Sequence, residues 1–347
     1  MLSVLVVLVV AACQERPAGP SERPRPTASS AVLPQPSAEA GAAEARQDRK
    51  SDADSTELDE RATLRLLDPG KAPRQVLRHD LAVGQTTRWS VTLQALTQVG
   101  EDPPQTMDLG VEVRARVETA DADGATIGLT LAELSAIDDP TAGAAWRSLS
   151  GRRASVRVDR RGRLGLGPRL EDEPMDVATR QLWASVREAV IDAWPPYPFE
   201  AVGVGARWTV TRGLVRGGVR LRRTTRFELR ERDEQLRIRA QLEEAPRPGG
   251  YADPALGGAV TLEALKGTGI GRRRWSGLTD GGFALHAETE IATDLLVRVR
   301  LATPDAPPPA DRLVKTTQVS SLSRTSPSAP SASPSLDPPP ETSHNAP

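Results

Sequence analysis

Apolar and polar residues alternate with a period of two along most of the middle of this chain, and this pattern limits the possible folds more than any other feature. Every second residue from Trp89 to Leu93 is apolar. From Val111 to Val117 apolar residues again occupy every second position, and the residues between them are charged. Successive side chains of a β-strand point to opposite faces, so such segments have one buried and one solvated face. The sequence therefore predicts a mainly β, antiparallel structure.

The same alternation recurs along the body of the chain, separated by short polar turns. Thr126–Leu134 follows the turn that begins at Asp121, which predicts a hairpin. Val156 and Val158 lie on a strand that ends at Asp159. Further strands are expected at Trp208–Val215, Val219–Arg230, Leu236–Leu242, Val260–Ile270, Phe283–Ile291, Leu295–Leu301 and Leu313–Leu322. This number of strands favours a curved antiparallel sheet or a partly closed, barrel-like structure.

One helix, at about residues 172–194, is expected between the strands. It starts at an acidic segment with Pro174 in its first turn, and Pro195 ends it. Its apolar residues recur every fourth position and predict a stripe that packs on the sheet. They are Leu182, Val186, Val190 and Trp194. Matching Gly-x-x-x-Arg-Trp segments open a strand on each side of the helix and end at Trp89 and Trp208, which suggests two related halves.

The first thirteen residues indicate export and lipidation. The apolar run from Val4 to Ala12 is shorter than the roughly 20 residues of a membrane-spanning helix and is typical of a signal peptide, although no Lys or Arg precedes it. The segment ending at Cys13, the only cysteine, resembles the bacterial lipobox, whose cysteine receives a diacylglycerol. In the usual Gram-negative sorting rule Gln14 favours the outer membrane. The alternatives are an ordinary cleaved signal and a short anchor.

The two ends of the chain differ from its body in composition. After a signal peptide at 1–12, residues 13–60 are rich in Pro, Ala, Ser, Glu and Arg, and 324–347 form a Ser/Pro tail. Such segments lack the apolar surface that offsets the entropy cost of ordering, so both are expected to be disordered. The first is interpreted as a tether, with wall-spanning or partner binding as the alternative. Residues 61–323 then form a single β-rich domain.

One segment carries a resemblance to a known family. Residues from Pro198 to Trp208 are similar to the Pro-x-x-Pro-Val-Gly-x-Gly-x-x-Trp motif of a bacterial envelope lipoprotein family of the delta-proteobacterial type, of unknown function. Ala201 stands where the family has its second proline. The resemblance implies an envelope location and a helix followed by strands, and it implies no catalytic residues. The residues themselves favour a structural role: Gly203 and Gly205 permit a tight turn, and Trp208 anchors the strand.

An arginine-rich hairpin is the most unusual feature of the body. On 219–230 the apolar face carries Val219, Leu221, Thr225, Phe227 and Leu229. Guanidinium groups suit phosphate oxygens, so the opposite face is a candidate anion-binding face. The preferred interpretation is a solvated face that is neutralised by pairing with Glu288 and Glu290 of a later strand, and anion binding is the alternative. The candidate residues are Arg220, Arg222, Arg226, Arg230, Arg237 and Arg239.

The sequence shows no recognisable catalytic or cofactor motif. Neither His79 nor His286 has ligand spacing to another His or Cys, and His344 lies in the tail. The glycines of 267–271 lie within strand-like sequence, whereas a dinucleotide site needs a strand, a glycine turn and a helix. We therefore expect no metal, no cofactor and no enzymatic activity. A net charge of −1 gives no reason to expect nucleic acid as a partner.

Three functions remain in order of preference. The first is an exported lipoprotein, lipid-anchored at the outer membrane, with a non-enzymatic binding or structural role in the cell envelope. Its expected partners are the membrane and an anionic envelope polymer or lipid. The second is a periplasmic lipid or lipoprotein carrier, which needs an apolar hollow. The third is a hydrolase, which needs a nucleophile and a base in contact.

Overall fold

A single large sheet forms the body of the protein. The computed structural model describes residues 62–136, 147–164, 169–170, 177–191, 193–216, 218–233, 235–252, 260–278, 283–284, 286–301 and 308–325. These residues form one 13-stranded sheet in which twelve strands follow the order β1-β7-β8-β9-β11-β12-β13-β2-β3-β4-β5-β6, and β10 pairs beside β11. Every pairing is antiparallel. The mainly β, antiparallel fold expected from the alternation is confirmed.

The strands vary widely in length. Six of them reach 14 residues or more, and the two shortest contain two residues each. The bounds are β1 Thr63–Asp68, β2 Thr86–Val99, β3 Gln105–Ala120, β4 Gly124–Ala136, β5 Arg153–Asp159, β6 Arg169–Leu170, β7 Arg207–Arg216, β8 Val219–Arg232, β9 Leu236–Pro246, β10 Tyr251–Ala252, β11 Val260–Leu278, β12 His286–Leu301 and β13 Ala310–Arg324.

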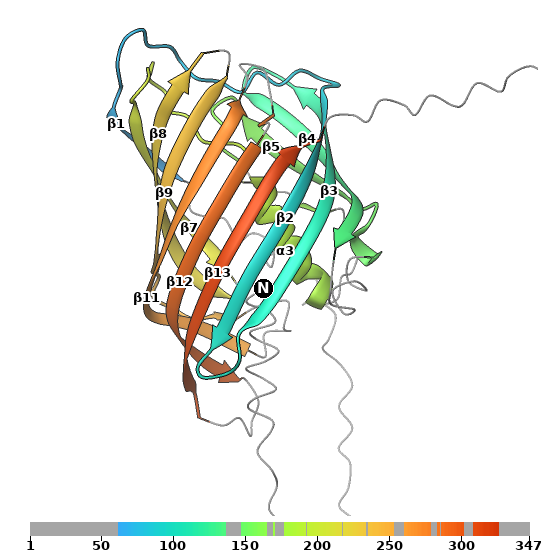
Figure 1. The fold of residues 1–347 in the computed structure, drawn as a ribbon, viewed down its shortest axis with the longest axis vertical. Helices are drawn as coiled ribbons and strands as arrows, with labels where there is room; N and C mark the ends of the chain where they lie inside the picture. Colours follow the sequence, from blue (N-terminus) through green and yellow to red (C-terminus); the bar gives the residue numbers. More distant parts are fainter. Residues whose placement is uncertain are drawn as a thin grey trace, which may run out of the picture.

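The sheet curves strongly but does not close on itself (Figure 1). Its two edges are β1 and β6, and no pairing joins them among the strands described. The segment at 69–80 runs between the two edges. It bonds to the segment before β7 through the bridge between Gln75 and Val202, and to the turn after β5 through the N–H of His79, which donates to the carbonyl of Arg160 at 2.8 Å. The curved antiparallel sheet is therefore the form found, of the two that were expected.

The helix α3 (Val177–Ile191) lies on the concave side of the sheet, where it contacts β2 and β13 (Figure 1). Trp183, Val186 and Val190 are buried against the strands, which confirms the predicted packing of this helix on the sheet. The side chain of Leu182 and the expected start at 171–174 lie outside the described residues.

The predicted end of the helix at Trp194 is wrong by three residues. Regular helix stops at Ile191, and the N–H of Ala193 bonds to the carbonyl of Val190 in a tighter turn. Pro195 has no N–H and disfavours helical geometry in the residue before it, so the last turn opens before the proline is reached. Trp194 is nevertheless buried, because the turn directs it into the core.

Two apolar clusters occupy the concave side. The larger, which we call the tryptophan core, contains all five tryptophans whose side chains are described: Trp89, Trp183, Trp194, Trp208 and Trp275. The smaller, which we call the aliphatic core, contains Val99, Val219, Leu221, Val260, Leu262, Ala264, Leu295, Val297, Val299 and Val314. Strands β2, β8, β11, β12 and β13 contribute residues to both.

The strand predictions differ from the structure mainly at polar interruptions. The two strands expected at 283–291 and 295–301 are one strand, β12, because Thr293 points inward and keeps the alternation in phase between Ile291 and Leu295. Strand β11 continues past Ile270 to Leu278, through three consecutive arginines. The short strands β1, β6 and β10 were not expected from the sequence.

Candidate functional site

A belt of charged side chains lies on the concave side of the sheet. On β8 the inward positions are the odd-numbered ones, and Arg223 follows Leu221 in that series. On β9 the inward positions are even-numbered, and Glu244 follows Leu242. The two residues are cross-strand partners, and both are at least 97% buried. The alternation that builds the apolar face therefore also carries two opposite charges into the interior.

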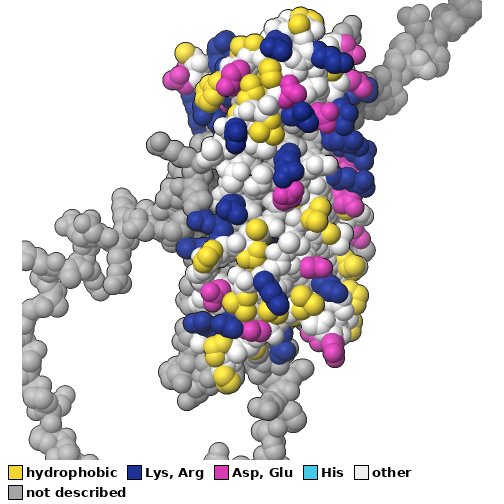
Figure 2. Space-filling view, turned by 90° about the vertical axis from the view of Figure 1, so that its left-hand side faces the viewer, with side chains coloured by type: hydrophobic (Ala, Val, Ile, Leu, Met, Phe, Trp, Pro, Cys, Tyr) yellow, Lys and Arg dark blue, Asp and Glu magenta, His cyan; other side chains and the backbone are white. Residues whose placement is uncertain are grey.

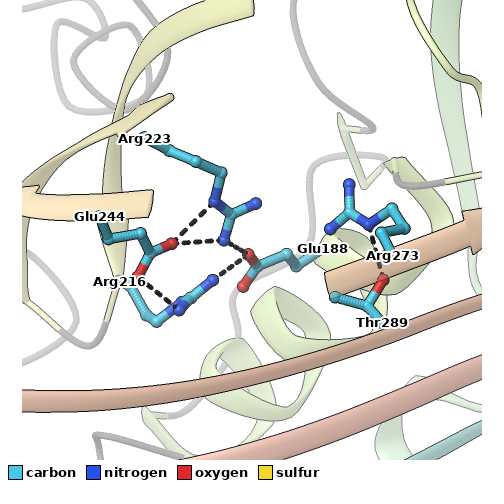
Figure 3. Close-up of polar contacts among 6 residues, drawn as sticks. All are labelled: Glu188, Arg216, Arg223, Glu244, Arg273 and Thr289. Atoms are coloured by element: carbon cyan, nitrogen blue, oxygen red, sulfur yellow. Dashed lines mark hydrogen bonds and ion pairs between the residues drawn. The ribbon is translucent and has the colours of Figure 1, made fainter. Parts of the chain in front are cut away.

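These charges form a closed ion-pair cluster with one residue of the helix and one of β7 (Figure 3). The Nε–H of Arg223 donates to Glu244 Oε1 at 2.7 Å, and its Nη2–H to Glu188 Oε1 at 2.7 Å. Arg216 donates from Nη1 to Glu244 Oε2 at 2.9 Å and from Nη2 to Glu188 Oε1 at 2.6 Å. We call Glu188, Arg216, Arg223 and Glu244 the internal ion cluster. Each carboxylate accepts from both arginines, so the helix and three strands are joined at one point.

Burial dominates the protonation of Glu244. Desolvation of its carboxylate raises the pKa above the ordinary value, and the negative charge of Glu188 acts in the same direction. The guanidinium of Arg223 opposes this rise by its charge and its hydrogen bond, and Arg212 on β7 adds a weaker effect of the same sign. The pKa of Glu244 therefore depends on its arginine partners remaining in place.

Glycines on β11 make room for the cluster. Gly267, Gly269 and Gly271 occupy three successive inward positions beside β12, and the last two also pair with β9. A Cβ at Gly269 would lie 3.0 Å from Glu244 Oε2 and 3.0 Å from Thr293 Oγ1. The Gly-x-Gly-x-Gly run at 267–271 is thus a part of the inner sheet face without side chains, and it lies in a strand, as the sequence indicated.

The cluster suits positioning rather than catalysis. Its carboxylates are held by guanidinium groups, and removing one member of a buried pair costs about 3–5 kcal/mol because the other charge is left without compensation. Such a cluster restricts the helix to one docked arrangement. Within the described parts of the chain, no group of three or more His, Cys, Asp or Glu side chains is placed to hold a metal ion.

The six arginines predicted to form an anion-binding face do share one surface. All six are exposed and alternate outward on β8 and β9. Three of them pair with carboxylates of their own hairpin: Arg226 with Glu243 at 3.4 Å, Arg230 with Glu228 at 2.8 Å and Arg237 with Glu231 at 2.9 Å.

The other three arginines have different surroundings. Arg220 lies over the ring of Tyr251, with 5.9 Å from its guanidinium carbon to the ring centroid. For Arg222 and Arg239 no ion pair is found within the described residues. Glu290, expected as a compensating partner, instead binds Arg272 at 2.6 Å. Figure 2 accordingly shows basic and acidic side chains intermixed on one flank of the molecule rather than a patch of one sign.

The two histidines of the body lie in different settings. His79 is buried, donates from Nε2 to the carbonyl of Pro195 at 3.1 Å and stacks on Tyr197. His286 is half-buried, and its Nδ1 shares a hydrogen bond with Ser323 Oγ at 2.8 Å. A serine beside a histidine is one part of a nucleophilic site, but hydrolysis also needs oxyanion donors and a group that orients the histidine. These two residues lie on neighbouring paired strands, whose backbone N–H groups serve the sheet.

The motif segment closes one end of the sheet. Gly205 has φ of +85°, and a Cβ at Gly203 would overlap the carbonyl oxygen of Lys71. Trp208 is fully buried and stacks on Phe227, with 5.4 Å between the ring centroids. Its Nε1–H donates to the carbonyl of Pro196 at 2.8 Å. The predicted structural roles of these residues are confirmed. Cys13, the tether, the tail and His344 lie outside the described residues.

Sequence reasoning missed the internal ion cluster. Arg223 occupies one of the odd-numbered, inward positions of β8, and this position in the alternation is the one feature of the sequence that could have pointed to the cluster. The expected second strand of the hairpin ended at Leu242, one inward position before Glu244. The approach of Glu188 to Arg216 depends on how a helix docks on a sheet, which alternation does not encode.

Comparison with known proteins adds little to this picture. No protein-family model matches the chain, and no curated protein matches it. Among solved structures, it is similar to an outer membrane channel of Pseudomonas putida F1, with 10% identity over 70% of this chain and 97% of that chain and a TM-score of 0.16. It is also similar to OmpT, an outer membrane protein of Vibrio cholerae, with 6% identity over 70% and 100% of the two chains and a TM-score of 0.16. At such TM-scores the chains do not superpose as wholes, so we base no argument on these matches. In the described part of the chain, no helix combines the length and the apolar character that crossing a membrane requires.

Proposed function

We propose that this chain is an exported lipoprotein of the cell envelope that acts by binding or scaffolding and not by catalysis. The observation that carries the proposal is the filled concave side of the sheet. Helix α3, the tryptophan core and the internal ion cluster occupy the space where a barrel-like protein would otherwise hold a ligand. A body of this kind presents its outer surface and its ends to partners.

The filled interior also bears on the second candidate, a lipid or lipoprotein carrier. A carrier needs an apolar hollow large enough for an acyl chain, and ligand pockets commonly have volumes of about 300–1,000 Å³. In the described residues the concave side carries tryptophans packed at van der Waals distance and a charged belt. The binding or structural role is therefore the better supported of the two.

Attachment to the outer membrane is the second part of the proposal. It rests on the resemblance of the segment ending at Cys13 to a lipobox and on Gln14 as the following residue. The similarity of Pro198–Trp208 to the envelope lipoprotein motif supports the same location. The long polar segment up to residue 60 then serves as a tether between the lipid and the sheet.

The proposed partner is an anionic envelope polymer or lipid, such as the phosphate groups of lipopolysaccharide. It would bind the six-arginine face of β8 and β9, chiefly through Arg222 and Arg239, because Arg226, Arg230 and Arg237 already pair with carboxylates. Arginine forks suit phosphate oxygens, and each basic side chain near an anionic surface contributes about 1 kcal/mol.

Binding to purified lipopolysaccharide tests this partner. The double charge reversal Arg222→Glu and Arg239→Glu should weaken binding at least about 10-fold at low salt. The matched control reverses Arg88 and Arg116, which are exposed on the outer face of β2 and β3. Equal losses in the two double variants would show non-specific charge attraction and would remove the arginine face from the proposal.

Palmitate labelling in a Gram-negative host tests the anchor. The wild-type chain should incorporate labelled palmitate and fractionate with the outer membrane, and Cys13→Ser should lose both properties. Gln14→Asp should keep the label and move to the inner membrane under the sorting rule. A Cys13→Ser chain that still takes up palmitate would refute lipidation at this residue.

A further inference from the structure

A small pocket with mostly apolar walls and a few polar groups lies on the concave side, next to the internal ion cluster. Inward side chains of β7, β8, β12 and β13 line it, so it joins strands that are far apart in the sheet order. Its accessible volume is about 10 Å³, which is the space that a single water-sized particle needs. Its apolar walls are Leu221, Ile291, Leu295 and Val314, and its polar groups are Arg216, Thr293, Thr316 and Gln318.

Polar atoms at this pocket lack partners among the described residues. Arg216 uses Nη1 and Nη2 to bind Glu244 and Glu188, while its Nε is buried without a hydrogen bond. Thr316 Oγ1 is buried without a hydrogen bond, and so is Oγ1 of Thr97, its cross-strand neighbour on β2. A buried polar atom without a partner costs about 1–3 kcal/mol, so such groups commonly mark a bound water or ion.

The hydrogen-bonding properties of these groups indicate which kind of ligand the pocket would bind. The Nε–H of Arg216 only donates and carries positive charge, and threonine hydroxyls rotate freely to donate. A particle that accepts hydrogen bonds therefore satisfies the Nε–H of Arg216 and the hydroxyl of Thr316 together. The apolar walls of the pocket leave the charge of the Arg216 guanidinium poorly screened. These surroundings favour a small anion.

We propose that the pocket binds one monovalent anion of halide size, chloride under physiological conditions, through Arg216 Nε–H and the hydroxyl of Thr316. Thr97 extends the hydrogen-bonding chain to β2. The anion links β7, on one wall of the curved sheet, to β13 on the opposite wall, and it fixes the guanidinium that also binds Glu188 of the helix. Chloride is thus a structural ligand that holds the curved sheet in shape around α3.

Thermal unfolding of the full chain at constant ionic strength tests this site. Replacing sodium gluconate with sodium chloride should raise the Tm progressively, because a ligand that binds only the folded state stabilises it by mass action. Thr316→Val removes the hydroxyl at similar volume and should abolish the chloride dependence. Thr317→Val is the matched control, since Thr317 is the next residue and points outward, and it should keep the full dependence.

A crystal grown or soaked in bromide gives an independent readout on the wild-type chain. An anomalous peak between Arg216 and Thr316 is expected, with no such peak in Thr316→Val. The proposal is overturned if the Tm is insensitive to chloride, if Thr316→Val retains the sensitivity, or if the pocket holds a water with no anomalous signal at high bromide. Should Thr316→Val fail to fold, the bromide map of the wild-type protein decides alone.

Discussion

At the scale of single residues, two adjacent arginines of β8 are expected to contribute very differently to the free energy of unfolding. Arg223 points inward and its side chain is 1% exposed, whereas Arg222 points outward to solvent. Burying a charge is unfavourable unless it is paired and hydrogen-bonded, while an exposed pair contributes about 0–1 kcal/mol. The two arginines therefore have unequal effects on stability although they are adjacent and chemically identical.

Substituting these two arginines by leucine tests the difference. Arg223→Leu should lower the free energy of unfolding at pH 7 by about 3–5 kcal/mol, because Glu244 is left buried with one partner fewer. Arg222→Leu should change it by less than about 0.5 kcal/mol. Urea unfolding followed by circular dichroism measures both, and similar losses in the two variants would contradict the placement of Arg223 in the cluster.

The loss in Arg223→Leu should depend on pH in a defined direction. Without Arg223 the pKa of Glu244 rises further, since burial is the largest influence on it and the arginine opposes that influence. A carboxyl whose folded pKa lies above its unfolded value takes up a proton on folding, so the variant regains stability as pH falls through the folded pKa toward the unfolded one. The difference between variant and wild type should therefore shrink at mildly acidic pH. A difference that grows on acidification would show the opposite coupling.

The carboxyl of Asp121 gives a second test at this scale, with the reverse sign. Its hydrogen bonds from Arg157, at 2.6 and 2.7 Å, lower its pKa most, and the backbone N–H groups of Asp123 and Gly124 add to the effect. Arg157→Gln should raise the pKa of Asp121 toward its ordinary value, as followed by NMR titration. In the wild type this carboxylate favours the folded state above its unfolded pKa, and the effect disappears as pH falls through the lower, folded pKa. An unchanged Asp121 titration in the variant would show that the backbone donors alone set it.

At the scale of elements, strands could be located from the sequence much better than the docking of the helix. Alternation is a local property, so Val219 to Leu229 revealed both the strand β8 and its buried face. The same rule also covers Arg223, but the inward face predicted from the sequence left this residue out, because a charge at a buried position is unfavourable until its partner is known. That partner, Glu188, comes from a helix 35 residues earlier, and no local pattern encodes such a contact. The sequence therefore predicted the strands of the fold but did not predict the internal ion cluster.

Helix α3 is held by apolar burial as well as by the ion cluster, and the two contributions are separable. Val190 is fully buried on the helix, and its apolar side chain takes no part in the ion pairs of the cluster. Val190→Ala should lower the free energy of unfolding by about 2 kcal/mol through lost burial and the cavity left behind. Val83→Ala removes the same atoms at a site that is 63% exposed and serves as control. A loss confined to the control, or equal in both, would exclude the observed docking of the helix.

At the scale of the whole molecule, two apolar cores lie along one curved sheet with a charged belt between them. Separate cores often unfold separately, but here long strands pass through both. Strand β12 places Ala287 and Ile291 on one side of the belt and Leu295 to Val299 on the other. Because these residues share one hydrogen-bonded strand, loosening the aliphatic core is expected to weaken pairing beside the tryptophan core as well.

This coupling predicts a single unfolding transition that reports on both cores. All five tryptophans with described side chains belong to the tryptophan core, so their fluorescence senses that region directly, while circular dichroism senses the whole sheet. Val297→Ala, in the aliphatic core, should lower the urea midpoint by the same amount with both probes. If the fluorescence midpoint stays at its wild-type value while the circular dichroism midpoint falls, the two cores unfold independently. The charged belt would then mark a boundary between two folding units, and the internal ion cluster would be acting as a joint between them rather than as part of one continuous core.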